Sequence, residues 1–251
     1  MRDEIIKFEN IYFSYGETLV LEDINFSVKR NDYIALMGPN GGGKSTMLKI
    51  ILGLIKPQKG VVKIFDKDPV SQRQKIGYLA QYSSFDFSFP INVFDLVLMG
   101  RYIINKRYYS PADKEEVYEA LKKVGMEHYD KRHLGSLSGG QLQRTLIARA
   151  IVKKPAILLL DEPMSGVDPQ AQKSIYDILN KLSKDMAIIL ITHDTSVVST
   201  DIGSVACLNR TLFYHGSAEG SLGKLAEAYK CPVEIIAHGI PHRVLGEHHD
   251  D

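Results

Sequence analysis

The chain has 251 residues, of which 44% are hydrophobic and 24% charged, a composition typical of a globular protein with one sizeable α/β core. Its formal net charge of +1 excludes the strongly basic composition of many nucleic-acid-binding proteins, so no nucleic-acid partner is expected. The two cysteines, Cys207 and Cys231, stand in unrelated contexts, which argues against a disulfide framework and for a reducing compartment. Because no apolar run approaches the ~20 residues that span a bilayer, work at a membrane would require another chain to do the spanning.

The first segment, residues 5–28, alternates apolar and polar side chains around a turn at Gly16-Glu17, which predicts an antiparallel β-sheet. Tyr15 ends one of these runs, upstream of a glycine-rich loop. Its ring is suited to stack on a nucleobase, but a half-buried strand tyrosine would look the same in the sequence. Both interpretations stay open at this point.

The glycine-rich loop is the strongest local signal in the chain. The apolar run 33–37 predicts a buried strand before it, and residues 47–52 suit a helix after it. The loop itself matches the phosphate-binding pattern G-x-x-x-x-G-K-[ST], with the residues Gly38, Pro39, Asn40, Gly41, Gly42, Gly43, Lys44, Ser45 and Thr46. Glycines let successive backbone N–H groups converge on phosphate oxygens, and the helix adds its positive N-terminal end.

Two side chains of this loop have expected roles in nucleotide binding. Lys44 is expected to reach the β- and γ-phosphates, and Ser45 to place its hydroxyl on Mg²⁺. A flexible turn with a chance lysine would not be expected to have the strand before it and the helix after it. The loop therefore predicts a site for a nucleotide and Mg²⁺.

Residues 89–152 are predicted to form a helical insert in the α/β core, after strands over 61–65 and 76–80. Pro90 precedes an amphipathic run, and the next helix starts at Ser110-Pro111-Ala112-Asp113, with an N-cap serine, a first-turn proline and an acid at the third position. Its apolar face ends at Gly125.

The core resumes with the unbroken apolar run 156–160, which predicts a central parallel strand buried on both faces. Asp168-Pro169 starts the following helix, and residues 187–192 predict another central strand. Strand–helix alternation on both sides of the insert predicts a mostly parallel sheet covered on both faces. Residues 204–208 and 212–214 are predicted to be edge strands.

Two adjacent carboxylates follow the apolar run. Asp161 lies at the carboxyl end of the predicted central strand, where open α/β sheets bind ligands, and it could hold Mg²⁺ through water. Glu162 is placed to orient or deprotonate an attacking water. One acid alone could be an ordinary strand-end carboxylate, whereas the pair after an apolar strand predicts a hydrolytic site.

Four further motifs make the sequence resemble the ATP-binding cassette (ABC) family. The segment Leu137 to Gln141, followed by Gln143-Arg144, resembles the family's signature, and Ile157 to Pro163 resembles its second nucleotide motif. The next loop, Ser165 to Asp168, and the strand-end His193 resemble the family's conserved loop and switch histidine. The resemblance covers nearly the whole chain in the right order.

The resemblance implies a fold and a division of the chain. The fold would be a P-loop NTPase core of the α/β class, with a mostly parallel central sheet and an N-terminal antiparallel β subdomain. The core with this β subdomain would occupy residues 1–88 and 153–215. An inserted α-helical subdomain would occupy 89–152, and a C-terminal extension 216–251.

The resemblance also implies roles for further residues. Gln81 would contact Mg²⁺ and the attacking water and sense the transmembrane partner, and His193 would bond the γ-phosphate of ATP. The signature residues that would bind ATP, together with the acid that ends the next loop, are Ser138, Gly139, Gly140, Gln141 and Asp168. Because one chain has one phosphate loop and one signature, a head-to-tail homodimer is implied, with each ATP between Lys44 of one copy and Ser138 of the other. Hydrolysis would release this dimer.

The segment 81–102 resembles ATPase subunits of importers for zinc, manganese or iron, and also those of importers for iron-siderophore complexes and corrinoids. The tail from His238 to Asp251 holds four of the eight histidines, which suits either metal ligands or a solvated polar tail. The implied protein is a peripheral ATPase on the cytoplasmic face of the cell membrane that powers import of divalent metal ions, with zinc and manganese foremost, and an importer of iron-siderophore complexes or corrinoids is the alternative. It would work with permease subunits and indirectly with an extracytoplasmic solute-binding protein. An alternative class is an ABC ATPase without a transport role, acting in translation or DNA repair.

Overall fold

The computed structural model describes residues 4–81, 90–102, 108–192, 202–217, 235–236 and 242–243. The chain divides into two compact units. Unit 1 combines residues 1–28, 33–69 and 191–251, and unit 2 combines residues 29–32 and 70–190. The limits of these two units differ from those of the predicted subdomains. The predicted subdomain limits stay predictions. No helix in the described ranges is long and apolar enough to cross a bilayer.

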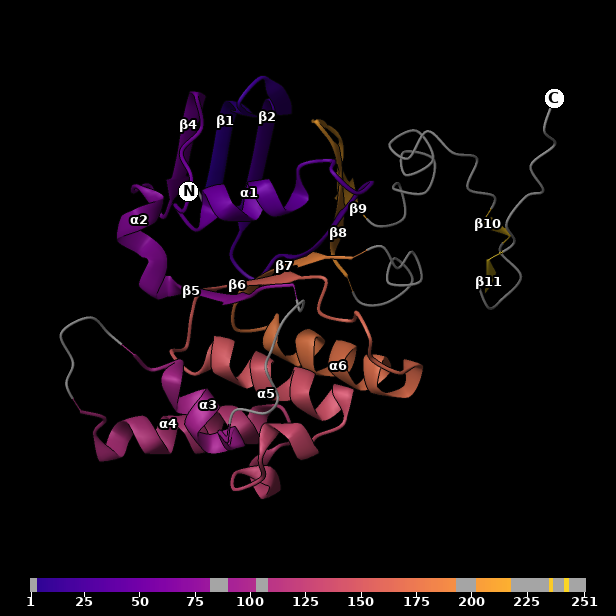
Figure 1. The fold of residues 1–251 in the computed structure, drawn as a ribbon. Helices are drawn as coiled ribbons and strands as arrows, with labels where there is room; N and C mark the ends of the chain where they lie inside the picture. Colours follow the sequence, from indigo (N-terminus) through magenta and orange to yellow (C-terminus); the bar gives the residue numbers. More distant parts are fainter. Residues whose placement is uncertain are drawn as a thin grey trace. The chain divides into compact units, whose positions relative to one another are not determined.

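Unit 1 contains the N-terminal antiparallel sheet that the alternating sequence pattern predicts (Figure 1). Its strands are β1 (Glu4–Tyr15), β2 (Thr18–Lys29) and β4 (Lys59–Ile64), in the order β2-β1-β4. β4 pairs antiparallel to β1. Apolar side chains of β1 and β2, such as Phe8 and Phe26, are buried and meet edge to face across the two strands.

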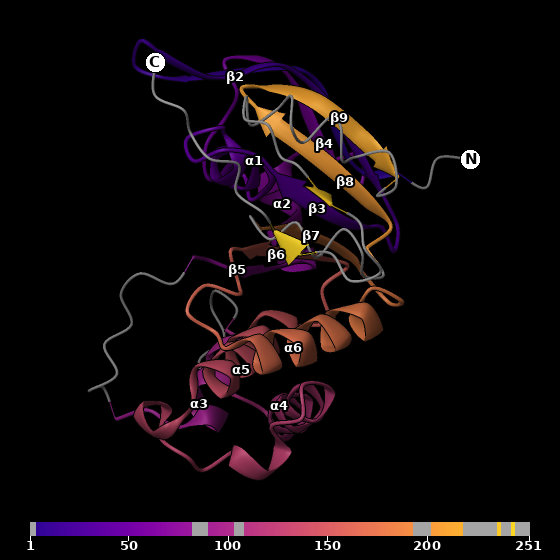
Figure 2. The same ribbon diagram turned by 90° about the vertical axis from the view of Figure 1, so that its right-hand side faces the viewer.

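Three further strands of unit 1 are β3 (Tyr33–Met37), β8 (Ser204–Asn209) and β9 (Thr211–Ser217). β8 runs parallel to β3 and antiparallel to β9, so it lies between them (Figure 2). The prediction of an edge strand over 204–208 is therefore wrong. Residues Val205 to Leu208 are fully buried. An unbroken apolar run of this kind is typical of a strand that is covered on both faces. Helix α1 (Lys44–Ile51) follows β3 through the glycine-rich loop.

Two short strands lie in the C-terminal tail. β10 (Ile235–Ile236) and β11 (His242–Arg243) pair antiparallel. The tail histidines other than His242 lie outside the described residues, so the two interpretations of the tail stay open.

Unit 2 contains the strands β5 (Ile76–Leu79), β6 (Ile157–Asp161) and β7 (Ala187–Ile191) in the order β5-β6-β7. β5 and β6 run parallel, and every residue of β6 and β7 is buried, which confirms the predicted central strands. Two short helical turns, α2 (Pro69–Gln72) and η1 (Arg73–Lys75), precede β5, and α6 (Pro169–Leu182) follows β6.

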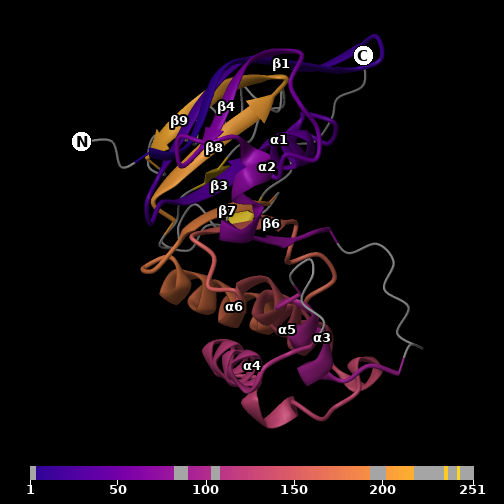
Figure 3. The ribbon, with the colours of Figure 1, turned by 90° about the vertical axis from the view of Figure 1, so that its left-hand side faces the viewer.

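Three further helices of unit 2 lie between β5 and β6 in the sequence: α3 (Val93–Met99), α4 (Pro111–Lys123) and α5 (Gly139–Ile151) (Figure 3). The turns η2 (Glu127–Tyr129) and η3 (Leu134–Ser136) connect α4 to α5. The start of α4 is the predicted one, because Ser110 and Asp113 form a reciprocal capping box with proline at the first turn. The chain leaves α4 at Gly125, whose φ of 68° suits glycine.

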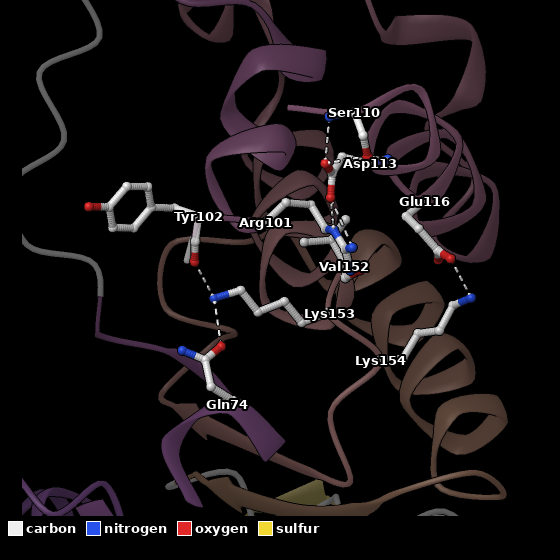
Figure 4. A network of polar contacts seen from close by, with 9 residues as sticks. All are labelled: Gln74, Arg101, Tyr102, Ser110, Asp113, Glu116, Val152, Lys153 and Lys154. Atoms are coloured by element: carbon white, nitrogen blue, oxygen red, sulfur yellow. Dashed lines mark hydrogen bonds and ion pairs between the residues drawn. The ribbon is translucent and has the colours of Figure 1, made fainter. Parts of the chain in front are cut away.

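A buried ion pair ties these three helices together (Figure 4). Oδ1 of Asp113, a residue only 1% exposed, lies 2.9 Å from Nη2 of Arg101 and accepts a hydrogen bond from its Nε at 3.0 Å. The other carboxylate oxygen accepts from the backbone N–H of Ser110 at 2.7 Å, and Nη1 of Arg101 donates to the carbonyl of Val152 at 3.4 Å. Arg101 thus connects the end of α3 to the start of α4 and the end of α5.

We predict that Asp113→Ala lowers the free energy of unfolding by roughly 3 kcal/mol, because it leaves the guanidinium of Arg101 without its carboxylate and removes a helix cap. Urea denaturation followed by circular dichroism measures this. The matched control is Glu116→Ala on the same helix, which breaks the solvent-exposed ion pair with Lys154 and should cost about 1 kcal/mol or less. Equal losses in the two variants would contradict a structural role for the buried pair.

Candidate functional site

In unit 1, the glycine-rich loop lies between the end of β3 and the start of α1. Gly38 has φ of 146° and Gly43 has φ of 99°, backbone conformations that side chains rarely permit. A Cβ on Gly38 would overlap the carbonyl of Leu208 in β8, and one on Gly43 would lie 2.6 Å from a methyl of Leu21. Glycine is therefore required at these two positions, because Leu208 of β8 and Leu21 of β2 lie too close to the loop to leave room for a side chain.

Lys44 is the first residue of α1 and only 6% of it is exposed. Its Nζ donates to the carbonyls of Gly38 and Pro39 at 2.9 and 2.8 Å, so the ammonium lies over the loop. Ser45 follows it, half-buried, and Thr46 is buried. The first turn of α1 has no acidic residue that would neutralise its positive end, which fits the binding of an anion such as a phosphate group.

Tyr15 is the last residue of β1 and is 47% exposed. Its ring meets that of Phe13 edge to face, with centroids 4.9 Å apart. Tyr15 is thus partly exposed, which is compatible both with stacking on a nucleobase and with a half-buried strand tyrosine.

In unit 2, Asp161 and Glu162 occupy the carboxyl end of β6. Asp161 is 4% exposed. Partial burial of the Tyr78 phenol on the neighbouring strand β5 raises the pKa of this tyrosine, and the charge of Asp161 raises it further. Glu162 has φ of 48°, in the left-handed region, which costs a non-glycine residue roughly 1 kcal/mol. The chain therefore turns sharply directly after β6, at the residue expected to act on water.

Gln81 and Glu162 are in direct contact, an interaction that sequence reasoning missed. Nε2 of Gln81 donates to Oε2 of Glu162 at 2.7 Å. The parallel register of β5 and β6 pairs Leu79 with Leu160, and continuing this register by two residues sets Gln81 opposite Glu162. Because a carboxylate only accepts hydrogen bonds, the amide must turn its NH₂ towards Glu162. Its carbonyl oxygen then remains the atom suited to a cation or a water.

The signature residues begin helix α5. Ser138 is its N-cap: its hydroxyl accepts from the backbone N–H of Gln141 at 3.3 Å, and Oε1 of Gln141 accepts from the N–H of Ser138 at 3.0 Å. Ser138 and Gly139 are exposed, whereas Gly140 is buried against α6, where a Cβ would lie 2.5 Å from that of Ala171. The two side chains thus cap the helix and leave its N-terminal end exposed.

Asp168 is the N-cap of α6, and its Oδ1 accepts from the backbone N–H of Ala171 at 2.9 Å. Because Gly140 in α5 packs against Ala171 in α6, the first turns of the two helices lie side by side (Figure 2). His193 lies outside the described residues. Within the described ranges, no group of three or more histidines, cysteines and acids is arranged to hold a metal ion.

Comparison with known proteins identifies the family. Residues 21–165 match the family model described as ABC transporter. The chain belongs to the ABC transporter family. It shares the fold of the family's ATPase domains, and it is an ATPase that binds ATP.

Two curated relatives match almost the whole chain. The zinc uptake system ATP-binding protein ZurA of Listeria monocytogenes is 39% identical over 243 residues, which cover 93% of each chain. The manganese transport system ATP-binding protein MntA of Synechocystis is 38% identical over 225 residues, which cover 87% of this chain and 86% of the relative. A solved structure described as an inward-facing conformation of a metal-chelate type ABC transporter matches with a TM-score of 0.79 at 31% identity, covering 90% of this chain and 88% of the other.

We predict that the environment of Tyr78 makes this ABC ATPase sensitive to alkali. Its pKa is raised above the ordinary value of 10.0, so the folded protein keeps this phenol neutral where the unfolded chain loses the proton. The resulting stability is fully present below about pH 10 and is lost as the pH rises through the folded pKa. As the pH rises above about 10, the free energy of unfolding should therefore fall more steeply for the native protein than for Tyr78→Phe.

Denaturant titration at each pH measures this difference. The matched control is Tyr118→Phe on α4, at a tyrosine that is 48% exposed, and it should keep the steep fall of the native protein. If the free energy of unfolding fell equally steeply with pH in the native protein and in Tyr78→Phe, burial and Asp161 would not raise the pKa of Tyr78 as expected.

Proposed function

We propose that this chain is the ATP-hydrolysing subunit that powers import of divalent metal ions, with zinc and manganese foremost, through a separate membrane permease. The observation that carries this proposal is the 39% identity to a zinc uptake ATP-binding protein over 93% of both chains. The manganese relative adds a second ion of the same class. The protein would work as a peripheral subunit on the cytoplasmic face of the membrane, with permease subunits and indirectly with an extracytoplasmic solute-binding protein.

In this proposal the loop from Gly38 to Thr46 holds the phosphates of ATP. Its approach to β8, the buried ammonium of Lys44 and the acid-free first turn of α1 support that role. The hydroxyl of Ser45 and the carboxylate of Asp161 are oxygen donors of the type that Mg²⁺ prefers, Asp161 acting through water. When bound, Mg²⁺ would neutralise phosphate charge. Tyr15 would stack its exposed ring on the adenine.

Glu162 would orient the attacking water and take its proton. The hydrogen bond from Gln81 supports this role, because it fixes one carboxylate oxygen and turns the amide carbonyl of Gln81 away from the carboxylate, where it suits Mg²⁺ or the water. His193 would bond the γ-phosphate.

We further propose a head-to-tail homodimer. In it, the N-terminal end of α5, with Ser138 to Gln141, would meet the ATP held by Lys44 of a second copy, and Asp168 would lie beside it. The exposure of Ser138 and Gly139 supports a contact at this end of the helix. The capping box occupies the N–H groups of Ser138 and Gln141, so contacts through backbone N–H groups would use those of Gly139 and Gly140.

The test is uptake of labelled zinc, manganese and iron by cells that lack this chain. We predict loss of uptake of one ion, restored by the native sequence and not by Glu162→Gln. The purified Glu162→Gln variant should bind ATP normally but hydrolyse it roughly 10²- to 10⁴-fold more slowly, because it cannot accept the proton from water. The matched control is Glu119→Gln at an exposed site on α4, which should restore uptake.

Normal uptake of all three ions, in a strain without a second transporter for them, would contradict the proposed cargo. Loss of siderophore or corrinoid uptake instead would move the chain to that group of importers. Rapid ATP hydrolysis by Glu162→Gln would remove this residue from its proposed role.

A further inference from the structure

The loop between Glu162 and α6 consists of two successive turns. The backbone N–H of Ser165 donates to the carbonyl of Glu162 at 3.3 Å, and the N–H of Val167 donates to the carbonyl of Met164 at 3.2 Å. Glu162 starts the first turn in the left-handed backbone region. Such a conformation persists in a residue with a side chain only where its surroundings hold it there.

One side chain on α6 braces both turns. Nε2 of Gln172 donates to the carbonyl of Val167 at 2.9 Å and to that of Met164 at 3.3 Å. The carbonyl of Met164 has two lone pairs and can accept both this bond and the bond from Val167. Gln172 lies in the first turn of α6 and is half-buried, so it reaches back from the helix to the loop.

Helix α6, which carries Gln172, is stabilised by its N-cap and by a buried apolar face. Asp168 caps it, proline occupies its first position, and a continuous face with Ile175 and Leu179 is buried. The bracing bonds therefore link the strained residue after β6 to a packed helix. Without them, the loop could relax and Glu162 could leave its left-handed conformation.

We propose that Gln172 is a positioning residue for ATP hydrolysis: by holding the carbonyls of Met164 and Val167, it keeps Glu162 at the end of β6 with its carboxylate against Gln81. It touches no reacting atom itself. This inference rests on the proposed role of Glu162. Because its hydrogen bonds go to the loop after Glu162 and not to the phosphate loop, we expect Gln172 to affect the rate of hydrolysis and not the affinity for ATP.

The test compares three substitutions at this position by steady-state ATP hydrolysis. Gln172→Glu is nearly isosteric but has no donor and presents an acceptor to two carbonyl oxygens, so kcat should fall roughly 10- to 100-fold with KM for ATP unchanged. Gln172→Ala should lower kcat in the same direction. Gln172→Lys supplies an ammonium donor and should restore kcat to within about threefold of the native value.

The matched control is Gln170→Glu, which makes the same change of charge at an exposed position in the same turn of α6 and should leave kcat unchanged. A purely structural role would lower the melting temperature and would not be rescued specifically by a donor. Native kcat in both Gln172→Glu and Gln172→Ala would overturn the proposal, as would a loss of kcat in Gln170→Glu equal to that in Gln172→Glu. Failure of the underlying role of Glu162 is distinguished by Glu162→Gln, which would then hydrolyse ATP rapidly.

Discussion

The parallel pairing of β5 with β6 is the constraint on which the hydrolytic part of this structure depends. The register that sets Leu79 opposite Leu160 also sets Gln81 opposite Glu162, two residues further along each chain segment. The residues of β5 alternate between half-buried and buried, so a shift of its register by one residue would exchange its two faces. The pKa of Tyr78 on β5 is raised first by burial of its phenol and second by the charge of Asp161 at the end of β6.

Several polar side chains of the candidate site form hydrogen bonds that stabilise the local backbone. Ser138 and Gln141 cap α5, Asp168 caps α6, and Lys44 lies over the carbonyls of its own loop. The caps of α5 occupy the N–H groups of Ser138 and Gln141, so contacts with an anion through backbone N–H groups would come from Gly139 and Gly140. The helical part of unit 2 is stiffened in a similar way, because Arg101 joins three helices through a carboxylate that also caps one of them.

Much of the fold and the positions of the candidate residues could be predicted from the sequence. Caps such as Ser110 and Ser138 are local signals, and the strand–loop–helix context of Lys44 is read directly along the chain. The contact of Gln81 with Glu162 could not be predicted, because it depends on which strands pair and in which register. Gln172 gave no signal either, since its role arises from a loop conformation. The place of β8 between β3 and β9 could not be predicted either, because the sequence indicates a strand over 204–208 but not which strands pair with it.

The central claim is that Gln81 and Glu162 act as one group in ATP hydrolysis. It is tested most directly by a double-mutant cycle that measures kcat for Gln81→Ala, Glu162→Gln and the variant with both changes. The account predicts strong coupling, so that adding Gln81→Ala to Glu162→Gln slows hydrolysis by less than about threefold, although Gln81→Ala alone slows it at least about tenfold. Equal losses from Gln81→Ala in the two backgrounds would show that the residues act independently and would contradict the account.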